Sequence, residues 1–311
     1  MNGRVSDSRH PDPSSIVALR ADLAAAGYTA DAVRAAWGAI ADDAIGRGLL
    51  APARRGLADR ADALAVLCRL LFLGDPASVT DVDAALPTAG AAGLERLGLV
   101  RLGADTVTPT ALLRPQGYAD AGGSGQWWIV SDLDEAALGG ALPTGHVLGV
   151  GGASLTLAGL QLDTPAQRVL DLGTGCGIQA LRARRSAPRV VATDVSERAL
   201  QFTLLNAALN DVDGVEVRHG SLFEPVAGEE FDRVVSNPPF VITPRVAGVP
   251  EYEYRDAGFA GDDLVAAFVS GVGDVLAPGG TAQLLGNWEY REDADGLERV
   301  RAWVAASAHP L

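Results

Sequence analysis

Apolar residues recur at helical spacing over the first third of the chain. In residues 14–50 they lie three and four positions apart on either side of Gly27, which predicts two amphipathic helices joined by a turn. Three further helices are expected at 62–73, 79–86 and 91–97. Residues 98–115 then alternate around Gly103-Ala104-Asp105, which predicts a β-hairpin. Helices closed by a hairpin follow the element order of a winged helix, so we expect a mostly helical, winged-helix-like domain over 14–115.

The segments that flank this domain have weaker patterns. Residues 1–13 are polar and predict a flexible tail. Residues 118–126 are Gly-rich and favour an open connection, and the apolar run at 127–130 predicts a buried strand. The stretch at 149–154 is interpreted as irregular. We therefore expect residues 116–165 to connect two domains.

Strands and helices alternate strictly from Gln167 onward. The expected strands are 168–172, 189–194, 215–220, 231–237 and 280–288, and the expected helices are 177–185, 197–209, 262–276 and 293–306. Short apolar strands that alternate with helices predict a Rossmann-like, doubly wound parallel sheet, which places residues 166–311 in the α/β class.

A glycine loop lies between the first strand and first helix of this pattern, at Asp171–Gly177. Glycines allow the backbone to turn tightly and to approach a ligand closely. The loop could hold a dinucleotide pyrophosphate equally well. Asp171 would repel a pyrophosphate, however, and suits the cationic amino-acid end of S-adenosylmethionine.

Asp194 closes the second strand. A carboxylate there can accept hydrogen bonds from both ribose hydroxyls of an adenosine. The alternative is that Asp194 caps the following helix, a role that we assign to Ser196.

The fourth strand leads into Asn237-Pro238-Pro239-Phe240. Two prolines stiffen the loop and remove two backbone donors. The side-chain carbonyl of Asn237 and the main-chain carbonyl of Pro238 could hold both hydrogens of a planar NH2 group, while Phe240 stacks on its flat face. These contacts suit N-methylation, because such a nitrogen is a poor nucleophile and acceptors leave more electron density on it. The alternative is a Pro-rich turn with Asn as turn former.

With this loop, the segments VLDLGTGCGIQAL and ATDVSERALQFTLLNAALN resemble class I S-adenosylmethionine-dependent methyltransferases that carry the [ND]PP[YF] motif. The resemblance covers residues 166–306. The group includes release factor glutamine methyltransferases of the HemK/PrmC type, adenine amino-group methyltransferases of DNA and RNA, and ribosomal RNA guanine methyltransferases. It implies S-adenosylmethionine as cofactor and predicts no metal ligand.

The resemblance also implies roles for individual residues. The expected cofactor-binding residues are Asp171, Gly173, Thr174, Gly175, Gly177, Asp194, Val195, Ser221, Leu222 and Asn237, and the expected catalytic residues are Asn237, Pro238, Pro239 and Phe240. Ser221 stands where the family has an Asp that binds the adenine amino group, so the backbone of Leu222 could share that contact. Asn206 is expected to tether its helix to neighbouring loops.

Two other segments are assigned from the same resemblance. Tyr254, Arg255 and Asp256 are expected in a lid over the substrate, or as a surface ion pair. Ser154 or Thr156 could touch the cofactor, or could lie in a plain loop. The family fold has two further strands after the last helix, so we expect either a truncated chain or a sheet edge completed in another way.

Composition bears on the methyl acceptor. The net charge is −14, and an acidic protein repels phosphate backbones. No long apolar run predicts a membrane span, and the two cysteines favour reduced thiols in the cytoplasm. A protein glutamine amide is therefore the preferred acceptor. The alternatives are a nucleobase amine in structured RNA or DNA, a non-catalytic S-adenosylmethionine-binding protein and, more weakly, a nicotinamide-dependent enzyme.

Overall fold

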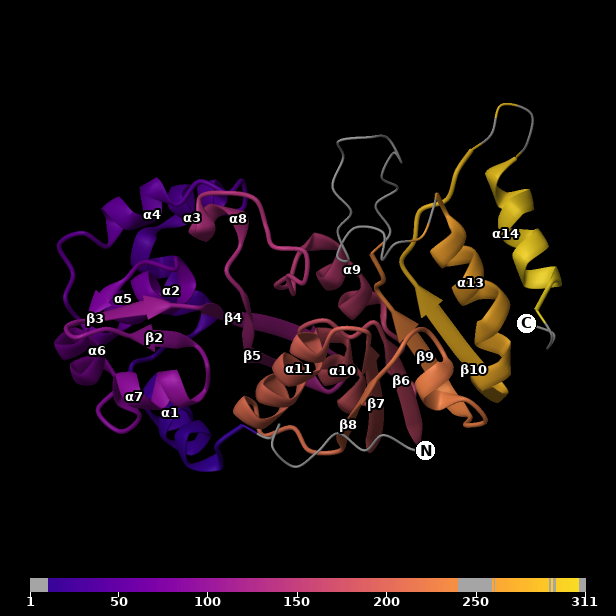
Figure 1. Ribbon diagram of the computed structural model, residues 1–311, viewed down its shortest axis with the longest axis horizontal. Coiled ribbons are helices and arrows are strands. Elements are labelled where there is room, and N and C mark those ends of the chain that lie inside the picture. Colours follow the sequence, from indigo (N-terminus) through magenta and orange to yellow (C-terminus); the bar gives the residue numbers. More distant parts are fainter. Residues whose placement is uncertain (1–10, 240–258, 260, 291, 293–294, 308–311) are drawn as a thin grey trace. The chain divides into compact units, whose positions relative to one another are not determined.

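The computed structural model describes residues 11–239, 259, 261–290, 292 and 295–307 (Figure 1). The chain divides into two compact units. The first unit runs to Leu142, with Ala208–Asp211 grouped with it, and the second begins at Pro143. The division falls within the segment 116–165.

Four helices open the first unit: α1 (Pro13–Ala25), α2 (Ala30–Trp37), α3 (Ala39–Ile45) and α4 (Ala51–Gly56). The sequence predicted one helix where α2 and α3 lie, and that prediction is wrong. Gly38 has a φ of 83°, in the left-handed region that glycine adopts most readily, and it separates the two helices. As a result, Ile40 is 86% exposed and does not join the core.

The winged-helix-like part follows as α5 (Ala63–Leu67), the π-helical turn η2 (Cys68–Phe72), β1 (Ala77–Ser78), α6 (Val79–Ala85), α7 (Gly90–Arg96), β2 (Val100–Leu102) and β3 (Thr106–Pro109). The three short strands form an antiparallel sheet in the order β1-β3-β2. The predicted hairpin at Gly103-Ala104-Asp105 is thus confirmed. Leu67 of α5 and Leu70 and Leu71 of η2, which lie in the predicted helix 62–73, are fully buried.

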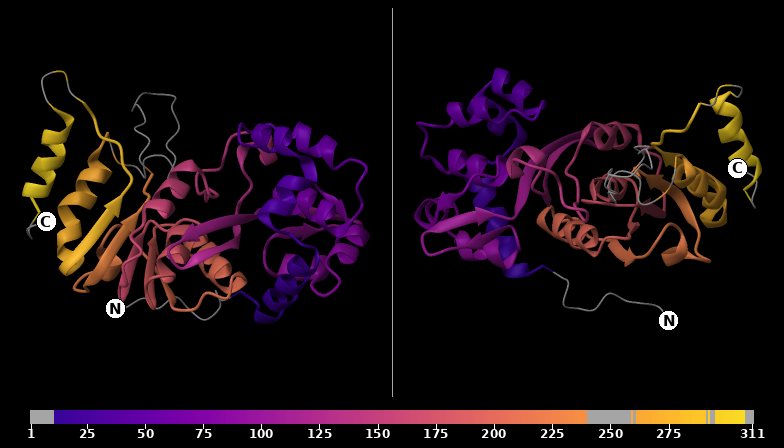
Figure 2. Two further views of the ribbon diagram at one scale, coloured as in Figure 1. Left: turned by 180° about the vertical axis from the view of Figure 1, so that it is seen from behind. Right: turned by 45° about the horizontal axis from the view of Figure 1, so that its top comes forward.

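A long ribbon of β4 (Ala111–Asp120) and β5 (Gly123–Asp132) comes next (Figure 2), followed by α8 (Glu135–Leu138). The expected open connection at 118–126 is instead the tip of this hairpin. Tyr118 stacks on Trp127 with ring centroids 4.1 Å apart, and such cross-strand aromatic pairs stabilise a ribbon. A Cβ on Gly125 would lie 2.5 Å from the Tyr118 hydroxyl, so this glycine makes room for the ring.

The second unit is built on β6 (Arg168–Leu172), β7 (Arg189–Asp194), β8 (Val215–His219), β9 (Phe231–Ser236) and β10 (Leu276–Leu284). These strands are parallel, in the order β10-β9-β6-β7-β8. Its helices are α9 (Gly152–Leu160), α10 (Ile178–Arg184), α11 (Glu197–Leu209), α13 (Asp263–Gly271) and α14 (Gly296–Ala305). The predicted doubly wound α/β fold is confirmed. Among the described residues, no helix has both the length and the apolar character that crossing a membrane requires.

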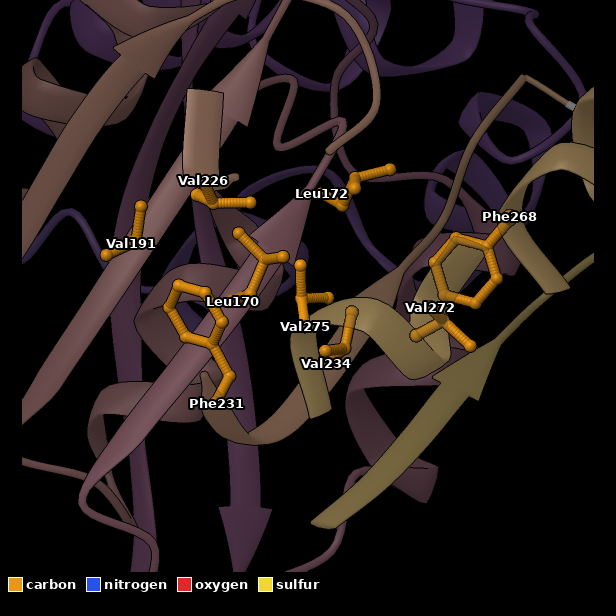
Figure 3. Close-up of a cluster of buried hydrophobic side chains, with 9 residues drawn as sticks. All are labelled: Leu170, Leu172, Val191, Val226, Phe231, Val234, Phe268, Val272 and Val275. Carbon is orange, nitrogen blue, oxygen red and sulfur yellow. The ribbon is translucent and has the colours of Figure 1, made fainter. Parts of the chain in front are cut away.

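Apolar side chains cover both faces of this sheet, as expected for parallel strands between helices. On one face, Leu170 and Val234 pack with Phe268 of α13 and with the 3-10 turn at Val272–Val275 (Figure 3). On the other face, strand valines pack against alanines of α10. The two faces together hold the strand ends in a fixed position.

The passage from α13 to β10 departs from the sequence pattern. The predicted helix 262–276 ends at Gly271, and a 3-10 turn leads directly into β10. The register of β10 on β9 shifts between Leu276 and Thr281, so β10 already begins before Pro278-Gly279-Gly280. A Cβ on Gly280 would lie 3.0 Å from the Phe231 carbonyl, and glycine therefore permits this irregular strand. α14 lies alongside α13 in both views of Figure 2.

Candidate functional site

The carboxyl ends of the parallel strands meet at one edge of the sheet. Leu172 at the end of β6 pairs with Thr193 of β7 on one side and with Ser236 of β9 on the other. The strand order reverses between β6 and β9, and ligands of doubly wound sheets bind at such switch points. The loops that carry Gly173 and Asn237 therefore begin side by side.

The glycine loop after β6 is held by backbone hydrogen bonds to the adjacent strand β7. The amides of Gly173 and Thr174 both donate to the Thr193 carbonyl at 2.9 Å. Gly173, Gly175 and Gly177 have φ values of 71°, 57° and 82°. A Cβ on Gly173 or Gly175 would meet no described atom within 4 Å, so the space in front of the loop is open to a ligand.

The back of the loop is closed. A Cβ on Gly177 would lie 3.0 Å from the Thr203 side chain on α11, and the Asn206 side chain donates to the Cys176 carbonyl at 2.7 Å. The expected tether from Asn206 is thus present. Cys176 is buried and free, like Cys68 in the first unit.

Asp171 lies beneath the glycine loop and is fully buried. Its Oδ2 accepts a hydrogen bond from the Thr174 hydroxyl at 2.7 Å, while Oδ1 has no hydrogen-bond partner among the described residues. Burial, reinforced by the negative charge of Asp194, raises the pKa of Asp171 to about 7, although the Thr174 hydroxyl opposes the shift. A cation at the loop would therefore gain from the ionised form of Asp171.

Asp194, at the end of β7, joins two segments of backbone. One carboxylate oxygen accepts from the Gly175 amide at 2.9 Å and the other from the Ser196 amide at 2.8 Å. Ser196 in turn accepts from the Ala199 amide through its own hydroxyl at 3.3 Å. The helix-capping bond thus comes from Ser196, as predicted, and Asp194 faces the glycine loop.

The other residues expected at the cofactor lie close to the end of β7. The Val195 carbonyl is 2.8 Å from His219 Nε2, and the Gly220 amide donates to the Asp194 carbonyl at 3.1 Å. Ser221 is half-buried. Leu222 has a φ of 46°, uncommon for a residue with a Cβ, and its side chain packs against the core. The packing of Leu222 therefore fixes the course of the backbone after β8.

Asn237 follows β9, and of its two amide atoms Nδ2 forms a hydrogen bond within the part of the chain that the structure describes. Nδ2 donates to Ser154 Oγ at 3.0 Å, whereas the buried Oδ1 has no hydrogen-bond partner among the described residues. Just before it, the Ser236 hydroxyl donates to the Leu172 carbonyl at 2.7 Å and fixes the end of β9 to β6. Pro238 is buried and Pro239 half-buried. Phe240 and the expected lid residues Tyr254, Arg255 and Asp256 lie outside the described residues.

Sequence reasoning missed the helix that reaches this loop. The stretch around Ser154 was expected to be irregular, but it forms α9, which begins at Gly152. Gly151-Gly152 disguised the helix start, and the leucines gave no clear helical signal, because Leu155 and Leu160 are 42% and 61% exposed and do not share a buried face with Leu157. Ser154 contacts Asn237, whereas the Thr156 hydroxyl donates to the Gly152 carbonyl within the same helix.

Comparison with known families agrees with this geometry. Residues 151–248 match the family model of the methyltransferase small domain, and residues 25–110 match one described only as a domain of unknown function. The matched methyltransferase segment lies, apart from Ala208–Asp211, within the second unit and includes the glycine loop and Asn237.

The curated relatives match this same part of the chain. A release factor glutamine methyltransferase of Xylella fastidiosa is 36% identical over 149 residues, which are 45% of this chain and 54% of the relative. One of Aliivibrio fischeri is 34% identical over 36% of this chain and 39% of its own length. A ribosomal protein uL3 glutamine methyltransferase of Bradyrhizobium diazoefficiens is 33% identical over 40% and 42%. The chain thus spans about half the length, or less, of these relatives.

A solved structure of a ribosomal protein L11 methylase from Lactobacillus delbrueckii subsp. bulgaricus is 22% identical, covering 49% of this chain and 65% of that one. The TM-score of 0.35 is too low for this likeness to bear on function.

Proposed function

We propose that this protein transfers a methyl group from S-adenosylmethionine to the side-chain amide nitrogen of a glutamine in a protein substrate. The observation that carries the proposal is the buried Oδ1 of Asn237, which has no hydrogen-bond partner among the described residues and lies beside the glycine loop. A buried acceptor without a donor is costly, and the N–H of an incoming amide would supply one. The three relatives named above are all glutamine methyltransferases.

The residues after β6 and β7 fit the cofactor. The open space at Gly173 and Gly175 would admit its amino-acid portion, and the buried carboxyl of Asp171 would favour that cationic end. Asp194 retains acceptor capacity for ribose hydroxyls, because a carboxylate offers about four lone-pair sites. Val195, Ser221 and Leu222 would border the adenine. S-adenosylmethionine, when bound, supplies a methyl group on a positively charged sulfur that becomes a neutral thioether.

The protein's own contribution is to hold the acceptor. In this proposal one N–H of the glutamine amide donates to Asn237 Oδ1 and the other to the Pro238 carbonyl, so the nitrogen is oriented with its π-face toward the methyl group. Both acceptors favour the positive charge that develops on nitrogen. The nitrogen gains a methyl group, and one of its protons then leaves to water. Phe240 would stack on the amide plane.

The charge of the chain favours a protein rather than a nucleic acid as partner. The net charge is −14, and a nucleic-acid enzyme generally presents a basic face. A cytoplasmic location accompanies the proposal, because release factors and ribosomal proteins act there.

The test is a transfer assay with methyl-tritiated S-adenosylmethionine. A release factor, a copy of it with the candidate glutamine changed to asparagine, and ribosomal RNA serve as acceptors. Label in the glutamine protein alone, recovered as N-methylglutamine, supports the proposal. Label in RNA alone would establish the nucleobase alternative. Cofactor binding by calorimetry without transfer to any acceptor would indicate a non-catalytic binding protein.

A further inference from the structure

Among the residues that the structure describes, the amide of Asn237 is held at one end, its Nδ2. Its Nδ2 donates to Ser154 Oγ at 3.0 Å, and the bond joins residues 83 positions apart in the chain. A terminal amide rotates in a broad, nearly two-fold well, so a side chain of this kind is poorly oriented by its own torsions. The serine contact fixes the amide plane and leaves Oδ1 facing away from Ser154.

Orientation matters because the two ends of an amide have opposite chemistry. Oδ1 accepts hydrogen bonds, whereas Nδ2 donates them and would repel an acceptor nitrogen that carries its own N–H groups. Oδ1 must therefore point at the acceptor nitrogen, and an amide free to swing out of its plane would lose that alignment. The Ser154 hydroxyl restrains the plane of the amide, so this contact affects turnover without touching the cofactor.

The helix that carries Ser154 is itself anchored. The Gln179 side chain donates to the Ser154 carbonyl at 2.8 Å, and Gln161 donates to the Gln179 side-chain oxygen at 2.7 Å. Arg182 Nε donates to the Ala158 carbonyl at 3.1 Å. Gln161, Gln179 and Arg182 are each at most 4% exposed. Buried polar side chains bonded in this way hold backbone firmly.

Gln179 connects this anchor to the cofactor side. It lies in the first turn of α10, two residues after Gly177, the last glycine of the loop. Gln179 thus lies in the first turn of the helix behind the glycine loop, and its side chain fixes the first turn of α9. The two loops of the site are linked through Gln179, Ser154 and Asn237.

Resting on the proposed function, we infer that Ser154 is a positioning residue that holds the amide plane of Asn237 in place, from a helix anchored to the glycine-loop helix by Gln179. In this inference Ser154 acts through its hydrogen bond to Asn237.

The chain offers a matched control in Thr156. Ser154→Ala removes the hydroxyl that meets Asn237, and Thr156→Ala removes a hydroxyl from the same helix that donates to the Gly152 carbonyl. Ser154→Thr keeps a hydroxyl at position 154. We expect Ser154→Ala to lower kcat on the glutamine substrate about tenfold, the effect of one lost hydrogen bond to a catalytic group. The cofactor Kd and the Tm should stay within experimental error, Ser154→Thr should restore most of kcat, and Thr156→Ala should be silent.

A readout without turnover separates this inference from the proposed function. The side-chain NH2 signals of Asn237, assigned by their loss in Asn237→Asp, should shift and exchange faster with solvent in Ser154→Ala but not in Thr156→Ala. If wild type methylates no glutamine while these signals behave as expected, the proposed function fails and the positioning contact stands. Unchanged signals with unchanged kcat in Ser154→Ala, or equal losses in Thr156→Ala, would overturn the inference.

Discussion

The loops after β6 and β9 leave neighbouring strands of one sheet, yet they are held in different ways. The glycine loop is held by the adjacent strand, since the amides of Gly173 and Thr174 both bond to Thr193. The β9 loop depends on a distant helix, since Asn237 bonds to Ser154 and keeps one acceptor open. In the proposed function, the cofactor loop has its backbone fixed by hydrogen bonds from neighbouring elements, whereas the loop that receives the acceptor amide keeps an unfilled hydrogen-bonding position among the described residues.

The largest effect is expected where that open acceptor is removed. Asn237→Ala should lower kcat about a thousandfold, because a preorganised acceptor for developing charge is lost. The Kd of S-adenosylmethionine should change less than about threefold, because Asn237 is expected to contribute at most one peripheral contact to cofactor binding. Single-turnover assays and calorimetry measure the two quantities. A loss of affinity that matched the loss of rate would assign Asn237 to the cofactor side instead.

Removal of the Asp194 carboxylate should have the reverse effect, a loss of cofactor affinity with little change in kcat. Asp194→Ala should raise the Kd of S-adenosylmethionine about 10- to 100-fold, the cost of losing charge-assisted hydrogen bonds. At saturating cofactor, kcat should remain near that of wild type. Asp213→Ala is the control, because its carboxylate is 93% exposed and pairs with Arg184 away from the loop. Equal Kd values in wild type and Asp194→Ala would refute the ribose role.

A substitution at the back of the glycine loop should lower the free energy of unfolding. Gly177→Ala imposes a left-handed φ on a residue with a Cβ and brings that Cβ to 3.0 Å from Thr203. We expect the free energy of unfolding to fall by about 2–3 kcal/mol, of which about 1–2 kcal/mol is backbone strain. Gly228→Ala isolates the strain, because its φ is 77° and its Cβ meets nothing within 4 Å. Identical urea midpoints for the two variants would mean that Thr203 moves aside without cost.

A further effect is a dependence on pH through Asp171, whose pKa burial raises to about 7. The folded protein binds this proton more tightly than the unfolded chain does. This contribution to stability is therefore full below about pH 4 and is lost as pH rises through about 7. Asp171→Asn should thus gain stability relative to wild type at pH 8 and little at pH 4.

The affinity for the cofactor should also depend on pH through Asp171, but it should rise with pH where the stability contribution of Asp171 falls. Ionised Asp171 attracts a cation, so the affinity of wild type for S-adenosylmethionine should rise between pH 6 and pH 8, and Asp171→Asn should flatten that rise. Calorimetry in buffers of different ionisation enthalpy would detect the proton released on binding at pH 7. A wild-type affinity that did not change with pH would exclude this linkage.

Much of the second unit could be predicted from sequence, since its strands are short apolar runs bounded by turn residues. β6 and β7 have the predicted bounds, and β8 and β9 differ from prediction by one residue. The wrong element predictions lie at segments in which glycine is compatible with more than one local structure. Gly38 breaks a helix, the glycines beside Tyr118 form a hairpin tip, and Gly151-Gly152 precede a helix. Local composition cannot separate these cases, because packing against residues remote in sequence decides among them.

The candidate site divides in the same way. The sequence by itself determined the glycine loop, the position of Asp194 at a strand end and the stiff Asn237-Pro238-Pro239 turn, because each follows from φ preferences and from short-range spacing. Only the tertiary structure decided that Asp194 bonds to Gly175 and that Ser154, rather than Thr156, meets Asn237. Hydrogen bonds between segments depend on which strands are neighbours and on how a helix is rotated about its axis. Neither property is present in any one stretch of sequence.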